Sequence, residues 1–263
     1  MNVNRSSQQE ALVLRVRPFG ESHASVDLLG AEDGLIPAVA YGLRSRRSSL
    51  RGKVVPFARG EAWLYRDPRQ ERSKINDFAV DRYALDLQHD LTAYYHASLW
   101  AELAWRSHAS GDTGAAAFQL LAEGLDLLQG IGLPERALTV SPEARARQVG
   151  LGVLWRYLAL LGMQPDLDYC VVSERAFRSQ EVRFYHSAEG GLVASEWSGP
   201  GMPQLPLRGV AFLRAAEERE LAILTARALD QETLLGVRSV VLAAVQAAAE
   251  GVLNTLDVAG GFL

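Results

Sequence analysis

A run of basic residues between Gly34 and Gly60 carries the clearest chemical signal in the sequence. Its 27 residues contain six positive charges and no acidic residue. The six are Arg44, Arg46, Arg47, Arg51, Lys53 and Arg59. Like charges packed this closely repel one another, and the phosphate backbone of a nucleic acid would screen that repulsion. We therefore predict that these six residues bind phosphates. Five of them lie in residues 42–53, which we call the basic loop, and a solvated loop without a ligand is the alternative.

Three further residues are candidates to extend this surface. Arg15 and Arg17 share one face of a predicted strand, because alternate residues of a strand point the same way. Tyr41 immediately precedes the basic loop, where its ring could stack a base. The alternative for Tyr41 is a place inside a small barrel, whose interior has to be filled by such side chains.

Catalytic and metal-binding signatures are missing from the sequence. It contains no H-E-x-x-H, G-x-S-x-G, C-x-x-C or G-x-G-x-x-G pattern. His89 and His96 could share a helix face, but no carboxylate pair completes a ligand set beside them. Cys170 has no histidine nearby in sequence to activate it, which favours a buried thiol. We therefore expect a binding protein rather than an enzyme, with no cofactor and no metal.

Charge is divided unevenly along the chain. Residues 1–82 hold 14 Lys and Arg against 10 Asp and Glu, whereas residues 83–263 hold 13 against 21. Such asymmetry indicates nucleic-acid contact by the basic part. Hydrophobic residues make up 48% of the chain, which indicates folded domains rather than disorder. The polar N-terminus and the lack of a long uninterrupted apolar run predict a cytoplasmic protein.

Short apolar or alternating runs separated by turn residues predict five strands in residues 1–82. The strands cover residues 11–19, 23–30, 34–42, 54–67 and 71–82. Five short strands without a helical period suit a small barrel, with an OB-fold favoured and an SH3-like barrel as the alternative. The expected class is α+β, with an OB-fold nucleic-acid-binding domain over residues 1–82 and a mostly helical domain over residues 83–263.

Helical periodicity begins after Tyr83. The predicted N-caps are Thr113, Ser141 and Asp230, and Ser141 is followed by proline at the first helical position. Helices are expected from the Thr113 cap to Gly130 and over residues 142–161, 211–228 and 232–253, and the start and stop signals are clearest for 142–161. The tail over residues 258–263 is expected to be loosely ordered.

The strand-rich part of the sequence resembles the N-terminal region of the bacterial RecO family. The resemblance rests on Arg17-Pro18-Phe19 followed by Glu21-Ser22, on Gly34 at the start of the third strand, and on the basic loop closed by Pro56-Phe57. It is specific over the predicted barrel and weak in the helical part. It implies an OB-fold, a helical C-terminal domain, and a recombination mediator in DNA repair that binds single-stranded DNA and anneals complementary strands without catalysis.

The same resemblance implies partners and a location. RecO-like proteins act with RecR and with single-stranded-DNA-binding protein, which they displace so that RecA can load, and double-stranded DNA is a further expected ligand. The implied location is the cytoplasm, in association with the nucleoid. The acidic helical part is a poor DNA surface and is expected to bind protein. An acidic peptide, such as the tail of single-stranded-DNA-binding protein, would need a basic pocket. The candidate residues for that pocket are Arg136, Arg145, Arg147 and Arg156.

Residues 164–206 depart from the family pattern. Many RecO-like proteins carry a four-cysteine zinc site in this segment. Here the four positions hold Cys170, Ser173, Ala194 and Trp197. Since three of the four thiolates are missing, we predict an irregular, zinc-site-like segment without zinc.

An RNA-binding OB-fold protein of translation or ribosome assembly is the alternative function. Composition and strand pattern fit it as well as they fit a DNA-binding protein, and the RecO-like motifs favour DNA. An enzyme acting on nucleic acid is a third hypothesis, but the sequence has no recognisable acidic cluster for its metal ions.

Overall fold

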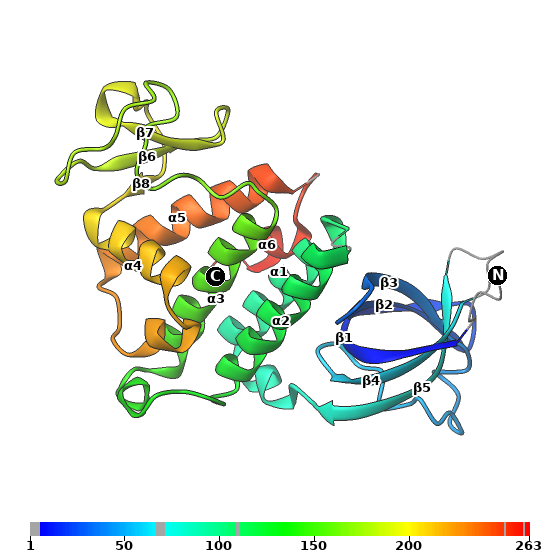
Figure 1. Cartoon of the computed structure of the whole chain (residues 1–263). Coiled ribbons are helices and arrows are strands. Elements are labelled where there is room, and N and C mark those ends of the chain that lie inside the picture. The colour runs from blue at the N-terminus through cyan, green and yellow to red at the C-terminus, as the bar shows by residue number, and fades with distance from the viewer. Residues whose placement is uncertain (1–5, 67–71, 109–110, 250, 260) are drawn as a thin grey trace. The chain divides into compact units, whose positions relative to one another are not determined.

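The computed structural model describes residues 6–66, 72–108, 111–249, 251–259 and 261–263 (Figure 1). The chain forms two compact units. The barrel unit comprises Met1–Asp86 and Ala101–Leu125, and the helical unit comprises Leu87–Trp100 and Asp126–Leu263. Residues 101–125 cluster with the barrel, although the sequence prediction assigns them to the helical domain. A domain boundary after residue 82 therefore remains our proposal.

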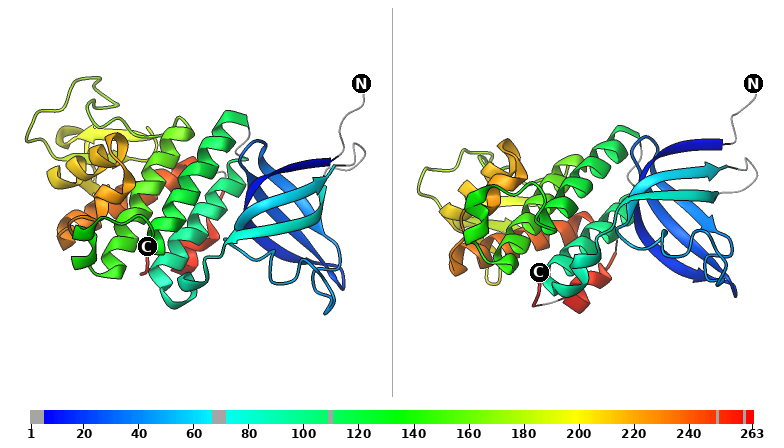
Figure 2. Two further views of the ribbon diagram at one scale, coloured as in Figure 1. Left: turned by 60° about the horizontal axis from the view of Figure 1, so that its bottom comes forward. Right: turned by 90° about the horizontal axis from the view of Figure 1, so that it is seen from below.

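Five strands of the barrel unit close into a barrel. They are β1 (Ser6–Phe19), β2 (His23–Gly30), β3 (Gly34–Ala40), β4 (Arg59–Tyr65) and β5 (Ser73–Arg82). Their order around the barrel is β1-β2-β3-β5-β4, and it is completed by a short parallel pairing of β3 with β5 and by the antiparallel pairing of β1 with β4 (Figure 2). A five-stranded barrel of this kind is an OB-fold, so the predicted α+β class is confirmed.

Small and branched side chains fill the barrel interior. Buried and partly exposed residues alternate along β4, which places Ala62 and Leu64 inside. Phe78 of β5 is the large aromatic residue of this core and is fully buried. Tyr41, just after β3, remains 47% exposed. Tyr41 therefore does not fill the interior.

The fourth strand begins later than the sequence predicts. Residues 54–58 form turns, and Phe57 takes a left-handed φ of 66°, which a strand cannot accommodate. The amide of Phe57 donates to the carbonyl of Val13 at 2.8 Å, and the amide of Val13 donates to the carbonyl of Ala58 at 2.9 Å. These two bonds bring the chain onto β1 before β4 starts. Residues 67 and 71, at predicted strand ends, lie outside the described residues.

The described α-helices are α1 (Leu91–Arg106), α2 (Gly111–Leu128), α3 (Pro142–Leu160), α4 (Leu207–Glu218), α5 (Gln231–Ala248) and α6 (Asn254–Ala259). Short 3-10 turns are η1 (Leu85–His89), η2 (Glu135–Thr139), η3 (Ser195–Trp197) and η4 (Leu221–Thr225). In the part of the chain that the structure describes, no helix has both the length and the apolar character needed to cross a membrane.

Two of the three predicted N-caps are confirmed. The Ser141 hydroxyl accepts the amide of Ala144 at 3.3 Å, and Asp230 accepts the amide of Thr233 at 2.9 Å. Each bond satisfies an amide that the first helical turn would leave without a partner. The prediction for Thr113 was wrong, because α2 begins two residues earlier, at Gly111.

The helix predicted over residues 211–228 was too long. α4 ends at Glu218, and the separate turn η4 follows it. The side-chain amide of Gln148, a buried residue of α3, donates to the carbonyls of Leu224 and Arg227. These bonds from a neighbouring helix hold the backbone after Glu218 in a non-helical conformation. The hydrophobic pattern of residues 211–228 does not reveal this. α5 likewise ends at residue 248 rather than 253.

Residues 164–206 are more regular than predicted. They contain a three-stranded sheet in the order β7-β6-β8, formed by β6 (Arg183–His186), β7 (Gly191–Ala194) and β8 (Gln204–Leu205). Cys170 is fully buried beside Val193 and Ala194, and Phe177, Phe184 and Met202 pack against them. Apolar packing therefore supports the sheet.

The C-terminal tail is packed rather than loosely ordered. α6 occupies residues 254–259, and the ring of Phe262 stacks on Tyr95 of α1 with 5.3 Å between ring centroids. Leu263 is buried, and its carbonyl accepts a hydrogen bond from Arg238 of α5. The prediction was wrong because these partners lie far away in the sequence.

Candidate nucleic-acid interface

The basic loop is an ordered part of the connection between β3 and β4. Leu43, Leu50 and Val54 are buried in the barrel core and anchor this connection at three points. Gly42 and Gly52 take left-handed φ values of 68° and 79°, which glycine adopts without strain. Hydrogen bonds between backbone groups close successive turns, from Ser45 to Gly42, from Ser48 to Ser45 and from Arg51 to Ser48. The charged side chains therefore project from a fixed backbone.

Four arginines of the basic loop are exposed to solvent. They are Arg44, Arg46, Arg47 and Arg51. None of the four forms an ion pair with an acidic side chain among the residues that the structure describes. Their mutual repulsion is thus left to solvent or a bound anion, and the planar guanidinium group matches phosphate geometry.

The other two predicted cations of this stretch are already paired. Lys53 Nζ lies 2.9 Å from Asp77 Oδ1 on β5, and Arg59 Nε lies 3.7 Å from Glu10 Oε1 on β1. The hydrogen bond from Lys53, with a second from the amide of Phe78, holds the pKa of Asp77 below its usual value. These two cations therefore have less free charge to offer a phosphate than the four exposed arginines.

Arg15 and Arg17 gather around one buried carboxylate. Arg15 Nε and Nη2 both lie 2.8 Å from Asp27 Oδ2, and Arg17 Nη2 lies 3.6 Å from the same oxygen. The Arg15 guanidinium also lies 3.6 Å from the ring centre of Trp105, within the barrel unit. This cation–π contact and the ion pair fix Arg15 in place. Arg17 is the more exposed of the two, with 48% of its side chain accessible.

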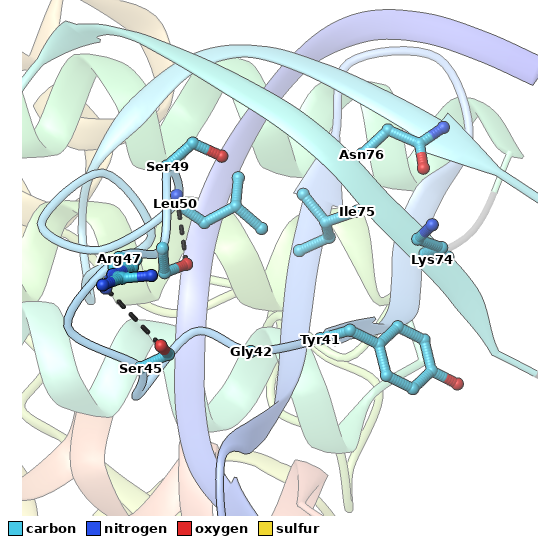
Figure 3. A pocket seen from close by; sticks show the side chains of 10 residues that line it. Tyr41, Gly42, Ser45, Arg47, Ser49, Leu50, Lys74, Ile75 and Asn76 are labelled. Atoms are coloured by element: carbon cyan, nitrogen blue, oxygen red, sulfur yellow. Dashed lines mark hydrogen bonds between the residues drawn. The ribbon is translucent and has the colours of Figure 1, made fainter.

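A pocket of about 420 Å³ lies between the basic loop and β5 (Figure 3). Tyr41 and Lys74 lie towards one end of it in this view, and Arg47 towards the other. Leu50 and Ile75 lie between them, and none of the acidic residues that the structure describes lines the pocket. The pocket thus combines an apolar centre with cationic ends.

Lys74 and Asn76 of β5 were missed by the sequence reasoning. Both are exposed and line the same pocket as Tyr41. The cross-strand register passes from Leu64↔Ile75 to Trp63↔Asp77, so Asn76 is the extra residue of a β-bulge. The charge of Lys74 is readable from the sequence, but its approach to the basic loop depends on the parallel pairing of Val39 with Lys74.

The four arginines proposed for peptide binding contact different segments of the helical unit. Arg136 is exposed in η2, while Arg145 donates to the carbonyls of Ala137 and Val140. Arg147 pairs with Glu143 at 2.9 Å, and Arg156 donates to the carbonyls of Ala216 and Arg219. Arg145, Arg147 and Arg156 are thus each held by a partner within the helical unit, and Arg136 is the exposed member of the set.

Cys170, the one cysteine at the four zinc-site positions, has a buried thiol that takes part in hydrogen bonds. Burial acts to raise its pKa, but hydrogen bonds from Ser173 and from the amides of Ala194 and Val172 outweigh burial and lower it. Ser173 and Ala194 thus contact the sulfur, whereas Trp197 is exposed. Within the described ranges, no group of three or more His, Cys, Asp or Glu side chains is placed to hold a metal ion.

Comparisons with known proteins identify both parts of the chain. The family model for the N-terminal part of recombination protein O matches residues 1–81, and the model for its C-terminal part matches residues 88–256. A protein named DNA repair protein RecO from Bifidobacterium animalis subsp. lactis is 30% identical over 217 residues, 80% of this chain and 82% of its own. A protein of the same name from Gloeobacter violaceus is 31% identical over 184 residues, 70% of this chain and 65% of its own. The chain therefore belongs to the RecO family of DNA repair and recombination proteins.

Proposed function

We propose that this protein binds single-stranded DNA through the basic loop of its barrel and acts as a recombination mediator without catalysing a chemical step. The observation that carries the proposal is the set of four exposed arginines, held on an ordered backbone without acidic partners among the described residues. Binding would release counterions from the phosphates that these arginines neutralise. Membership of a DNA repair family favours DNA as the polyanion.

Annealing follows from the same electrostatics. Two complementary strands repel each other through their phosphates, and a shared cationic surface screens that repulsion. Base pairing then proceeds without a general acid, a nucleophile or a metal ion. Arg17, Tyr41, Lys53 and Arg59 are secondary contacts in this proposal, and the paired Arg15 is the weakest candidate.

The proposed partners are RecR and single-stranded-DNA-binding protein, and indirectly RecA. The acidic helical part is expected to contact proteins rather than single-stranded DNA, because its excess of carboxylates repels phosphates. Arg136 is exposed, whereas backbone carbonyls occupy Arg145 and Arg156, so Arg136 is the member of the proposed peptide cluster most open to a partner. Double-stranded DNA as a ligand, and a cytoplasmic, nucleoid-associated location, complete the proposal.

The direct test is the affinity for single-stranded DNA across a salt series, measured by fluorescence anisotropy. The variant changes Arg44, Arg46, Arg47 and Arg51 to Ala. The wild type should lose log affinity with log salt at a slope of about −0.7 per neutralised phosphate. The variant should bind single-stranded DNA more weakly, and the magnitude of its salt slope should decrease by the amount expected for the loss of several phosphate contacts.

A matched control removes the same charge from the helical unit. It changes the exposed residues Arg136, Arg178, Arg219 and Arg227 to Ala. The control should keep the wild-type slope. Equal behaviour of the loop variant and the wild type would leave the basic loop as a solvated charge run and overturn the proposal.

A second assay separates the DNA mediator from the RNA-binding alternative. Complementary DNA strands that carry a fluorophore and a quencher should anneal faster with the wild type than with the loop variant. Affinity for RNA equal to that for DNA, together with no acceleration of annealing, would favour the RNA-binding protein instead.

A further inference from the structure

We propose that the pocket between the basic loop and β5 receives one unstacked base of a single strand. This inference rests on the proposed function and adds a subsite to it. It also provides a physical reason for preferring single strands, because a base inside a duplex is paired and stacked and cannot enter. The residues that form the subsite are Tyr41, Arg47, Leu50, Lys74, Ile75 and Asn76.

The first wall is Tyr41, whose ring is exposed but held in position. His23 of β2 meets the Tyr41 ring edge-on, with 5.1 Å between centroids and 70° between planes. The Nδ1 atom of His23 accepts the amide of Gly42 at 2.9 Å, which fixes the backbone next to Tyr41. An exposed aromatic ring whose position is already restricted loses little entropy when a base stacks on it.

The second wall comes from β5. The bulge at Asn76 removes this residue from the regular cross-strand register. Asn76 is exposed, and its side chain makes no hydrogen bond to any other described residue. An amide group can both donate to and accept from the edge of a base. Bulges often redirect a side chain towards a binding site.

The pocket matches a nucleotide in size and in chemistry. Its volume of about 420 Å³ lies in the range of small-molecule sites. The exposed Tyr41 ring supplies the face on which a base can stack, while Leu50 and Ile75, both buried in the barrel core, close the floor of the pocket. Arg47 and Lys74 supply charge for the flanking phosphates, and neither forms an ion pair within the described part of the chain. One base and its two neighbouring phosphates would satisfy all of these groups.

The test uses the full-length protein and an oligo-dT strand that contains 5-iodo-deoxyuridine, which cross-links to a stacked aromatic ring on irradiation. Mass spectrometry should locate the adduct on Tyr41. The matched control is Tyr83→Ala, because Tyr83 is also an exposed tyrosine of the barrel unit but does not line the pocket. Tyr83→Ala should keep the adduct on Tyr41.

Affinities provide an independent readout. Tyr41→Ala should weaken single-strand binding about tenfold, and Tyr41→Phe, which keeps the ring, should lose much less affinity. Asn76→Ala should weaken binding less than Tyr41→Ala. The salt slope should stay unchanged in all three variants, because no phosphate contact is removed. A strand of abasic sites should bind the wild type and Tyr41→Ala equally.

The outcomes distinguish this inference from the proposed function. If Tyr41→Ala and Asn76→Ala bind as the wild type does, and the adduct forms elsewhere, the base subsite is wrong while the loop variant still tests phosphate binding. If the wild type binds no DNA, the proposed function and the subsite both fail. If the wild type binds abasic and natural strands equally, phosphates alone carry the affinity and the subsite is overturned.

Discussion

His96 on α1 lies directly against Gly150 on α3, with no room for a side chain between them. A methyl group added at Gly150 would overlap the imidazole ring. Trp100, one turn further along α1, donates from its indole nitrogen to the Gly150 carbonyl at 3.3 Å. The two helices of the helical unit therefore approach closely because position 150 is glycine.

Replacing Gly150 with alanine should destabilise the helical unit. Overpacking a filled core costs about 1–3 kcal/mol, and the better helix propensity of alanine offsets about 1 kcal/mol of this. The unfolding midpoint in urea, followed by circular dichroism, should fall. The double variant Gly150→Ala with His96→Ala should recover part of the loss, because the added methyl then occupies space left by the ring. Strict additivity of the two changes would show that the ring and the glycine are not coupled.

The same histidine should make stability depend on pH. Burial, with the nearby charges of Arg147 and Arg238, lowers the pKa of His96 from 6.5 to about 3. At a pH between these two values, His96 is protonated in the unfolded chain and neutral in the folded chain. As the pH falls from 6.5 to 3, protonation of His96 in the unfolded chain should lower the free energy of unfolding by about 1.4 kcal/mol per pH unit. Above pH 6.5 the contribution of His96 is constant.

Comparison with His96→Gln isolates that dependence. The variant removes the titrating ring, so its stability should decline less steeply than that of the wild type between pH 6.5 and 4.5. In NMR spectra the His96 ring signals should not titrate between pH 8 and 5. Parallel stability profiles, or a His96 midpoint near 6.5, would contradict a buried neutral imidazole.

Arg15 should contribute to stability rather than to DNA binding. Arg15→Ala leaves the buried Asp27 carboxylate with the more distant Arg17 as its cationic partner among the described residues, and it removes the contact with Trp105. The expected loss is about 2–3 kcal/mol in the free energy of unfolding, measured in urea. Arg15→Lys should not restore it, because an ammonium group lacks the planar face that stacks on the indole. Single-strand affinity should change less than twofold, and a large loss of affinity in an Arg15→Lys variant that circular dichroism shows to be folded would reverse this assignment.

Local patterns predict the chemistry of this protein better than they predict its contacts. The strands, the Ser141 and Asp230 caps and the charge of the basic loop follow from neighbouring residues, and the structure contains all of them. The pairing of Lys53 with Asp77 joins residues 24 positions apart, and the contact of Arg15 with Trp105 joins residues further apart still. Such contacts form only when the barrel closes, and the spacing of apolar residues along the sequence does not predict which strands meet.

The site itself shows the same division. The exposed arginines could be named from composition, because an acid-free basic stretch needs no tertiary information. The pocket could not, because it requires the parallel pairing of β3 with β5 and the bulge at Asn76. The break after α4 is similar, since the side chain of Gln148 in another helix holds the chain there.

The ion pair between Lys53 and Asp77 should limit what Lys53 contributes to DNA binding. Lys53 Nζ lies 2.9 Å from the Asp77 carboxylate, and its hydrogen bond lowers the pKa of Asp77, so the ammonium group already has an anionic partner. Lys53→Ala should therefore reduce the salt slope of single-strand binding less than Arg47→Ala does. Because the pair is exposed, its loss should cost less than about 1 kcal/mol of stability.

Freeing the lysine tests the same relationship in the opposite direction. Asp77→Asn removes the competing carboxylate, so single-strand affinity and the magnitude of the salt slope should both increase. Asp81→Asn is the matched control, because Asp81 is also exposed on β5 but lies about 13 Å further along the strand. A gain for Asp77→Asn that exceeds the gain for Asp81→Asn would place Lys53 among the phosphate contacts once its partner is removed. Equal gains would mean that only net charge matters and that the ion pair does not control the basic loop.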